Sequence, residues 1–278
     1  MIKRFFLLSM IIGLLFVPHK SLSVDARTGE LFETTDDIMQ AIRKGKTSDY
    51  KKCVYLTIMY DDDGSNSIPE NIFSFFPNVK ELTIEAGVSC INYYSIKDMK
   101  SLEILLLGNN CLTDIGFLED LPNLRRLAVP HNHIRNGDPI SFLSKLEFLN
   151  IEDNEFSDIS FVMKLNNLRD LIINDNKDIY DITPLSNLIL LEGLYMSNTS
   201  VTDISTIKCL TNLSELDISE LGINDLSPLS ALENLVWLDA RNNCITDASP
   251  LCTLKKLELI YLDGNPIQNI HDLNKGFD

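Results

Sequence analysis

The sequence is poor in positive charge, in tryptophan and in long apolar runs. Its 278 residues contain 24 Lys and Arg against 40 Asp and Glu, which gives a formal net charge of −16 at pH 7, and there is a single Trp. This acidic balance disfavours nucleic acids and anionic membrane surfaces as partners, because both would be repelled. No apolar run after Val17 approaches the roughly 18 residues of a membrane span, so the mature chain is not expected to insert into a membrane.

Sequence motifs of the common enzyme classes are missing as well. The chain has no phosphate-binding loop, no dinucleotide fingerprint, no nucleophile elbow and no zinc-protease motif. No convincing Ser/His/Asp set can be assembled from it. The sequence therefore predicts a protein that is not an enzyme and has no catalytic residue, no metal and no cofactor.

The first 23 residues have the pattern of a secretory signal peptide. Lys3 and Arg4 precede an apolar stretch that runs from Phe5 to Val17, and small residues follow. Cleavage is expected after Ser23, with Ala26 as the second choice and a retained membrane anchor as the alternative. Removal of residues 1–23 takes away three cations and no anion, so the charge changes from −16 to −19. The sequence thus predicts a secreted or periplasmic protein.

A period of 22 residues dominates the rest of the chain. Leucines recur at this step, with one extra residue between 176 and 179 that shifts the frame once; the series is Leu102, Leu124, Leu146, Leu168, Leu191, Leu213, Leu235 and Leu257. Repeats of this length indicate stacked units, because one unit cannot bury its own apolar face.

The spacing of apolar residues changes inside each unit. Leu149 and Ile151 are two apart, which suits a strand, whereas Phe156, Ile159 and the apolar residues after them are three apart, which suits a 3₁₀ segment. We therefore expect an α/β solenoid, curved because strands stack more closely than the bulkier returns. Its parallel β-sheet lies on the concave face, and its 3₁₀ or irregular returns lie on the convex face.

An asparagine column marks the turn of most units, where an amide can bond backbone groups that the turn leaves unpaired. Its members are Asn110, Asn132, Asn154, Asn176, Asn243 and Asn265, with Gly87, Thr199 and Leu221 as exceptions. Since Leu221 cannot form such bonds, its unit is expected to be locally weak or rearranged. Prolines at 184, 228 and 250 are expected to open the returns, where a fixed φ is useful.

The units 191–212, 213–234 and 235–256 carry Thr-Asp-Ile, Asn-Asp-Leu-Ser-Pro-Leu and Thr-Asp-Ala-Ser-Pro-Leu returns. With these motifs the chain resembles the 22-residue class of leucine-rich repeats, which includes bacterial internalins and a regulatory subunit of protein phosphatase type 1. The predicted organisation is a signal peptide (1–23), a helical N-terminal cap (24–52), a degenerate first unit (53–78) and clear units (79–278). The cap helix is expected to begin at Thr35 and to end near Lys44.

Two metal sites can be considered and are disfavoured. The segment from Asp61 to Glu70 matches part of a calcium loop, but Met59 stands at the first ligand position. His131 and His133 flank Asn132 without an evident third ligand. The favoured interpretations are a solvated insertion and surface histidines.

The six cysteines are expected in an oxidising compartment. Cys90 and Cys111, in adjacent units, are the most plausible pair, whereas Cys209 and Cys252 need a longer reach. Cys111 and Cys244 are too far apart to bond. Cys53 stands at an apolar core position, where a buried free thiol is expected.

Residues beside the two buried strand positions should point to the concave side, outside the core, because side chains alternate along a strand. In the C-terminal half they are aromatic or charged and form the predicted partner site: Phe148, Asp170, Tyr195, Glu215, Asp217, Trp237, Asp239, Arg241, Tyr261 and Asp263. Exposed aromatic anchors with surrounding charge are typical of an interface.

The sequence thus predicts an exported module that binds a protein or peptide, with a partner of basic surface as one option. The first alternative is an intracellular scaffold that resembles the phosphatase subunit, with the N-terminal stretch misinterpreted as a signal. The second is an enzyme with Asp217 and Asp239 as an acid/base pair. It is disfavoured because an open, solvated face does not readily shift a carboxyl pKa.

Overall fold

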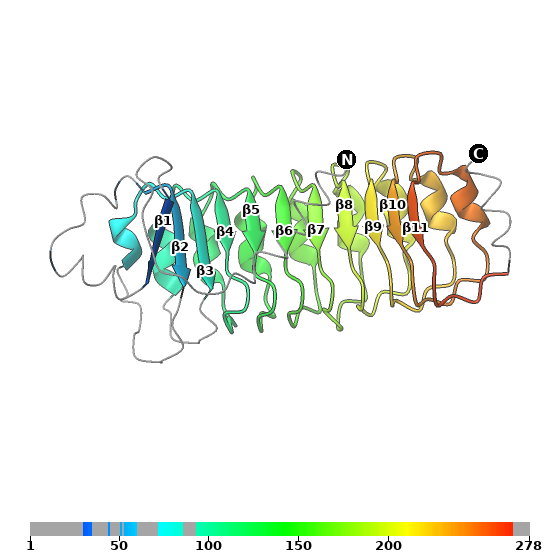
Figure 1. Ribbon diagram of the computed structural model, residues 1–278, viewed down its shortest axis with the longest axis horizontal. Helices are drawn as coiled ribbons and strands as arrows, with labels where there is room; N and C mark the ends of the chain where they lie inside the picture. The colour runs from blue at the N-terminus through cyan, green and yellow to red at the C-terminus, as the bar shows by residue number, and fades with distance from the viewer. Residues whose placement is uncertain are drawn as a thin grey trace.

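A single parallel sheet runs through the molecule. The computed structural model describes residues 30–34, 44, 51, 53–59, 72–85 and 93–268. In these ranges eleven strands pair in chain order, and Figure 1 shows them side by side along the long axis. They are β1 (Glu30–Thr34), β2 (Tyr55–Met59), β3 (Glu81–Glu85), β4 (Ile104–Leu106), β5 (Arg126–Ala128), β6 (Phe148–Asn150), β7 (Asp170–Ile172), β8 (Gly193–Tyr195), β9 (Glu215–Asp217), β10 (Trp237–Asp239) and β11 (Leu259–Tyr261).

Short 3₁₀ segments carry the chain back from one strand to the next, as predicted. They are η2 (Ile72–Phe75), η3 (Tyr93–Asp98), η4 (Gly116–Asp120), η5 (Asp138–Phe142), η6 (Ser160–Lys164), η7 (Thr183–Asn187), η8 (Ser205–Cys209), η9 (Ser227–Ala231) and η10 (Ser249–Thr253). Each of these segments packs against the next one in the chain. The predicted fold, a curved leucine-rich-repeat solenoid with strands on one face and 3₁₀ returns on the other, is confirmed.

One coil shows how the change in spacing works. Leu149 and Ile151 point from β6 into the core and are fully buried. The backbone then turns, and the N–H of Val162 donates to the carbonyl oxygen of Ile159 at 3.0 Å, the three-residue bond of a 3₁₀ turn. Residues three apart in the return therefore face the same way, so Ile159 and Val162 are buried together.

The core lies between the sheet and the returns and is continuous from coil to coil. The middle residue of each strand from β4 to β10 is fully buried; these residues are Leu105, Leu127, Leu149, Leu171, Leu194, Leu216 and Leu238. Burial of one such leucine stabilises the fold by about 2 kcal/mol. Because each coil covers its neighbour, stability is distributed along the stack.

The predicted extra residue is accommodated in the turn after β7. There the N–H of Ile179 donates to the carbonyl oxygen of Asn176 at 3.1 Å, which closes a tight turn. Asn176 and Ile179 both remain fully buried. The insertion therefore leaves the neighbouring coils in register, with Leu171 paired to Leu194.

The asparagine column binds one coil to the next. Asn132 Oδ1 accepts the N–H groups of Asn110 at 3.0 Å and Leu112 at 2.9 Å, both from the preceding coil. Its Nδ2 lies 2.9 Å from the carbonyl oxygen of Leu107 and 3.0 Å from that of Val129. The predicted role of the amide is confirmed, since one buried side chain here satisfies donors and acceptors of two coils.

A second column lies directly before the asparagines and was not foreseen. In eight successive coils the preceding residue has a φ between 48° and 77°; these residues are Asn109, His131, Asp153, Asp175, Asn198, Glu220, Asn242 and Gly264. Left-handed backbone favours Gly, Asn and Asp, which account for six of the eight. This sharp turn directs the asparagine side chain into the coil.

At Leu221 the chain keeps the common path. Glu220 has the left-handed backbone of the column, and the N–H of Leu221 donates to Asn243 Oδ1 at 3.1 Å. The expected rearrangement of this unit is therefore wrong, because backbone conformation and the next asparagine suffice to hold the turn. Local weakness of the unit stays a prediction.

The predicted prolines do open returns, since Pro184, Pro228 and Pro250 stand in the first turns of η7, η9 and η10. An aspartate before most returns adds a side-chain bond. Asp181 Oδ1, for example, accepts the N–H of Thr183 at 2.8 Å. The return thus begins at a fixed residue in each coil.

The N-terminal end contains a strand that the sequence analysis did not predict. Strand β1 pairs in parallel with β2, Leu31 opposite Leu56, within the segment 24–52 that was expected to form the cap. Of the predicted helix from Thr35 to Lys44, Lys44 alone is among the described residues. The signal peptide, its cleavage site and the calcium-like segment from Asp61 to Glu70 lie outside the described residues.

Candidate functional site

Parallel pairing in register sets the residues of the candidate site in rows across the strands. Gly193, Glu215, Trp237 and Leu259 follow one another in the first row. The second row, two residues further along each strand, contains Tyr195, Asp217, Asp239 and Tyr261. These are the rows that the strand alternation predicted.

An apolar stripe runs along the sheet on the side opposite the core. Ala128, Phe148, Ile172 and Tyr195 form a buried cluster of their own, and Leu106 and Trp237 pack against it. Strands lie only about 4.8 Å apart, so large side chains on a concave face cover one another. The stripe therefore spans β4 to β10 as a continuous apolar floor.

This packing corrects the expectation that the site residues lie outside any core. Phe148 is 2% exposed, Asp239 3% and Tyr195 8%. Four predicted residues are half-buried, namely Asp170, Glu215, Asp217 and Trp237, and three are exposed, namely Arg241, Tyr261 and Asp263. The accessible part of the site is therefore centred on β9 to β11, and Phe148 belongs to the floor beneath the Arg126 guanidinium.

Two aromatic rings of this accessible part, Trp237 and Tyr261, continue the buried ring of Tyr195. The ring centroids of Tyr195 and Trp237 are 6.0 Å apart at an interplanar angle of 42°. Those of Trp237 and Tyr261 are 6.2 Å apart, edge to face at 62°. Contacts of this geometry hold the rings in place, and we call Tyr195, Trp237 and Tyr261 the aromatic row.

The hydroxyl of Tyr195 is fixed by Glu215. It donates a hydrogen bond to Glu215 Oε2. Burial, and next the Glu215 charge, raise the pKa of Tyr195 far above its usual range, so the hydroxyl keeps its proton. Tyr195 therefore presents a ring and no charge.

Gly193 lies in close contact with Asp170 and Tyr195. A Cβ atom at this position would lie 2.8 Å from Asp170 Oδ1 and 3.2 Å from Tyr195 Cε2. The Asp170 carboxylate thus occupies the space that a side chain at 193 would fill. The sequence analysis did not detect this contact; its one signal in the sequence is a glycine that stands in register with Asp170 and Glu215 of the neighbouring strands.

Asp239 and Arg241 form a close ion pair on β10. The Arg241 Nε lies 2.9 Å from each carboxylate oxygen of Asp239, and Nη2 adds a further bond. The guanidinium carbon also lies 5.5 Å from the centre of the Tyr261 ring. Both oxygens of Asp239 are therefore engaged by Arg241.

Asp217 has the corresponding place on β9 but different partners. Its Oδ1 accepts the N–H of Ser219 at 3.0 Å and the Ser219 hydroxyl at 2.7 Å. Burial raises the pKa of Asp217 in spite of these bonds, and the nearby Asp239 charge adds to the rise. The expectation that this face leaves carboxyl pKa values unshifted is thus wrong for Asp217, because neighbouring side chains desolvate it.

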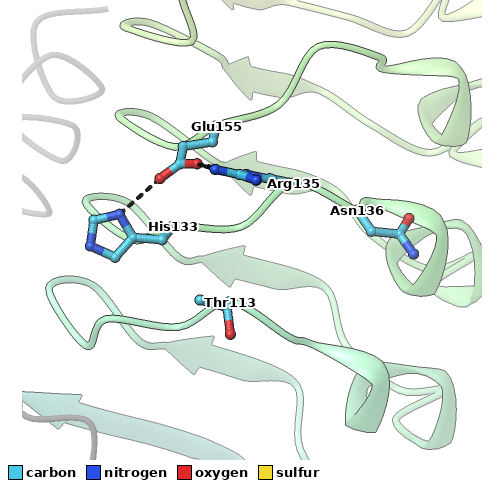
Figure 2. A pocket seen from close by; sticks show the side chains of 5 residues that line it. All are labelled: Thr113, His133, Arg135, Asn136 and Glu155. Atoms are coloured by element: carbon cyan, nitrogen blue, oxygen red, sulfur yellow. Dashed lines mark hydrogen bonds and ion pairs between the residues drawn. The ribbon is translucent and has the colours of Figure 1, made fainter.

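The histidines lie elsewhere, and each contacts a carboxylate of the next coil. His131 Nδ1 is 2.8 Å from Asp153 Oδ2, and His133 Nδ1 is 3.0 Å from Glu155 Oε1. Figure 2 shows His133 and Arg135 both facing Glu155 in an open pocket of about 440 Å³. Arg135 and then His133 lower the pKa of Glu155. The described residues contain no group of three or more His, Cys, Asp or Glu placed to hold a metal.

Cys53, Cys111, Cys209, Cys244 and Cys252 form no disulfide with one another in the described part of the chain. Cys53 is buried, as expected, and its Sγ lies 3.0 Å from the carbonyl oxygen of Tyr55. Cys209 and Cys252, considered as a distant pair, are not bonded. Cys111 is an exposed free thiol, and its favoured partner Cys90 lies outside the described residues.

Among the helical segments of the described ranges, none combines the length and the apolar character that crossing a membrane requires. This finding concerns those ranges alone.

Comparison with known proteins agrees with the observed architecture. A family model described as leucine rich repeats (2 copies) matches residues 233–275. The X-ray radiation resistance-associated protein 1 of Mus musculus is 33% identical over 98 residues, which are 34% of this chain and 12% of that protein. The chain thus spans a small part of this curated relative.

Solved structures extend the similarity to most of the chain. An internalin (inlF) of Listeria monocytogenes str. 4b F2365 has a TM-score of 0.72 and 26% identity over 80% of this chain and 64% of its own. Internalin C2 of the same strain has a TM-score of 0.60 and 24% identity over 82% and 91%. The plant peptide hormone receptor RGFR1, in complex with RGF2, gives 0.56 and 22% over 77% and 34%. This chain is similar to internalins and to leucine-rich-repeat receptors in fold.

Proposed function

We propose that the chain is an exported binding protein that takes a protein or peptide partner on the concave face of its repeats. The observation that carries the proposal is the aromatic row, whose rings contact one another beside carboxylates on β9 and β10. Rigid aromatic side chains that keep part of their surface accessible are the usual anchors of an interface. The continuous apolar floor gives a partner an extended surface to lie along.

The same geometry supports binding in preference to catalysis. An acid/base pair of Asp217 and Asp239 would need both carboxyl groups accessible to substrate. Asp239 is 3% exposed, and both of its oxygens are bonded to Arg241. Asp217, whose pKa is raised, therefore has no second accessible carboxyl group with which to act as an acid/base pair. We infer that the site is not enzymatic.

Charge supports a protein or peptide in preference to nucleic acid. The whole chain carries a net charge of −16, and four of its acidic residues, Glu215, Asp217, Asp239 and Asp263, lie together at the site beside the single cation of Arg241. A phosphate backbone would be repelled by this surface, whereas a basic partner would be attracted at long range.

Export is tested first by the N-terminus of the protein recovered outside the cytoplasm. Mass spectrometry should find a mature chain that begins at or near Val24, since small residues precede this position. Recovery of the protein in the cytoplasm with Met1 retained would overturn export and favour the intracellular scaffold.

Partner binding is tested by affinity capture with the mature chain, followed by titration of the captured protein. Ala at position 237 should weaken binding of that protein, whereas Ala at the exposed Lys208 of η8 should leave it unchanged. Equal affinity for both variants would remove the concave face from consideration.

A further inference from the structure

Asp217 and Asp239 are the same position of two successive coils, but only one of them has an arginine. They pair across β9 and β10, and each accepts the N–H of the residue two positions later, at 3.0 Å for Ser219 and 3.1 Å for Arg241. The backbone is therefore alike in the two coils. What differs is the side chain that follows: Arg241 covers Asp239, and the shorter Ser219 leaves Asp217 only half-buried.

From this difference we infer that Asp217 is a receptor for an arginine side chain of the partner, which binds it as Arg241 binds Asp239. The inference rests on the proposed function and names the chemistry that the concave face recognises. The partner is thus a protein or peptide segment that extends an arginine toward β9, beside the aromatic row.

The chain's own Arg241 supplies the pattern for this contact. It combines a two-oxygen contact to a carboxylate with a position 5.5 Å from an aromatic ring. Around Asp217 the same two elements are present, because the carboxylate is only half-buried and Tyr195 and Trp237 stand on the flanking strands. A planar guanidinium can donate to both carboxylate oxygens and lie beside an aromatic ring at the same time. An ammonium group is a point charge and lacks this pair of fixed, parallel N–H donors.

The charges of the site agree with an incoming cation. Within the described part of the chain, Glu215 and Asp217 take part in no ion pair, and Arg241 is already committed to Asp239. Burial, and then the Asp239 charge, raise the pKa of Asp217 although the Ser219 hydrogen bonds and the Arg241 charge act to lower it, so the anionic form is held at a cost that a further guanidinium would offset. Both points favour an arginine over a neutral or acidic group.

The chain has one tryptophan, so its fluorescence reports on this site alone. We would titrate the protein with an acetylated and amidated hexa-arginine peptide and follow the emission of Trp237. A saturable change is expected, with hexa-lysine weaker by about fivefold and hexa-glutamate without effect. No saturable change with hexa-arginine, or equal affinity for hexa-lysine, would overturn the inference.

Asp217→Asn should weaken hexa-arginine binding by about tenfold. Asp181→Asn is the matched control, since Asp181 is exposed before η7 and likewise accepts an N–H two residues later and a hydroxyl. It changes the net charge equally, so an equal loss in both variants would reveal general attraction to an acidic chain and contradict a specific receptor.

Ser219→Arg should supply the missing arginine from the chain itself and abolish the peptide-induced change. Ser197→Arg, one coil earlier, adds the same charge beside Tyr195, where no carboxylate precedes it by two residues. It should retain most of the binding. Similar behaviour of the two variants would contradict the inference, and circular dichroism of both establishes that each is folded.

Failure of this inference can be told from failure of the proposed function. If a captured partner binds the Trp237→Ala protein weakly but the Asp217→Asn protein normally, the concave site stands and the arginine receptor is wrong. If the partner is indifferent to both substitutions, the proposed function itself is wrong.

Discussion

The Oδ1 atom of Asn132 lies 3.0 Å from the backbone nitrogen of Asn110, which occupies the same position one coil earlier. The same relationship joins Asn243 to Leu221 at 3.1 Å. Each asparagine thus completes the turn of the preceding coil, and the apolar core alone does not fix the stacking.

Asn132→Ala should lower the free energy of unfolding by about 3 kcal/mol, because it leaves buried N–H and carbonyl groups of two coils without partners. Chemical denaturation measures the change. Asn123→Ala is the control, since Asn123 donates to Lys100 at an exposed position and should cost less than about 1 kcal/mol. Equal losses of unfolding free energy in the two variants would show that the asparagine column contributes no more to stability than an exposed asparagine does.

Leu221→Asn should raise the free energy of unfolding by about 1 kcal/mol. The turn already has the common backbone, so an amide there can accept the N–H groups of Thr199 and Val201, as Asn132 accepts those of Asn110 and Leu112. The gain is small because burial of the leucine side chain is lost at the same time. A less stable variant would mean that apolar packing decides at this turn.

Asp217→Asn should stabilise the folded chain at pH 7. Because its pKa is raised in the folded state, the folded protein holds the proton more tightly than the unfolded chain does. The free energy of unfolding therefore falls as the pH rises from the ordinary aspartate pKa of the unfolded chain to the raised pKa of folded Asp217. An asparagine at position 217 does not ionise, so the Asp217→Asn variant does not show this decrease. Melting temperatures should differ at pH 7 and converge near pH 3; a destabilised variant at pH 7 would contradict the burial argument.

Thiol accessibility follows from the positions of the cysteines. Brief alkylation of the native protein should label Cys111, Cys209 and Cys244, which are exposed, and should leave Cys53 unlabelled until the chain is unfolded. Peptide mapping by mass spectrometry assigns each label. Rapid labelling of Cys53 would place it outside the core.

Sequence reasoning predicted the solenoid because its signal is repeated. The leucine step, the change of spacing after Leu149 and the asparagines each recur in many coils, so a single irregular residue such as Leu221 does not obscure them. Strand β1 was missed because its pairing with β2 depends on contacts distant in sequence, and the segment around it carries no repeat.

Only part of the candidate site could be predicted, because contacts between neighbouring coils are not visible in the sequence. The alternation of side chains along strands assigned Trp237 and Tyr261 to the correct face. It could not show that Phe148 and Tyr195 are buried by neighbours on that face, since side chains of adjacent coils meet only after stacking. The same holds for the pairing of Arg241 with Asp239, which depends on rotamers.

The most direct test of the account is the affinity of a captured partner for the Trp237→Ala protein, measured by titration calorimetry with Lys208→Ala as control. Contacts with Tyr195 and Tyr261 imply that this substitution also costs about 1 kcal/mol of stability, so the titration must be made well below the melting temperature. The account predicts a loss of about 2 kcal/mol in binding, roughly thirtyfold, and no change for the control. A partner that binds the Trp237→Ala protein as tightly as the parent would contradict it.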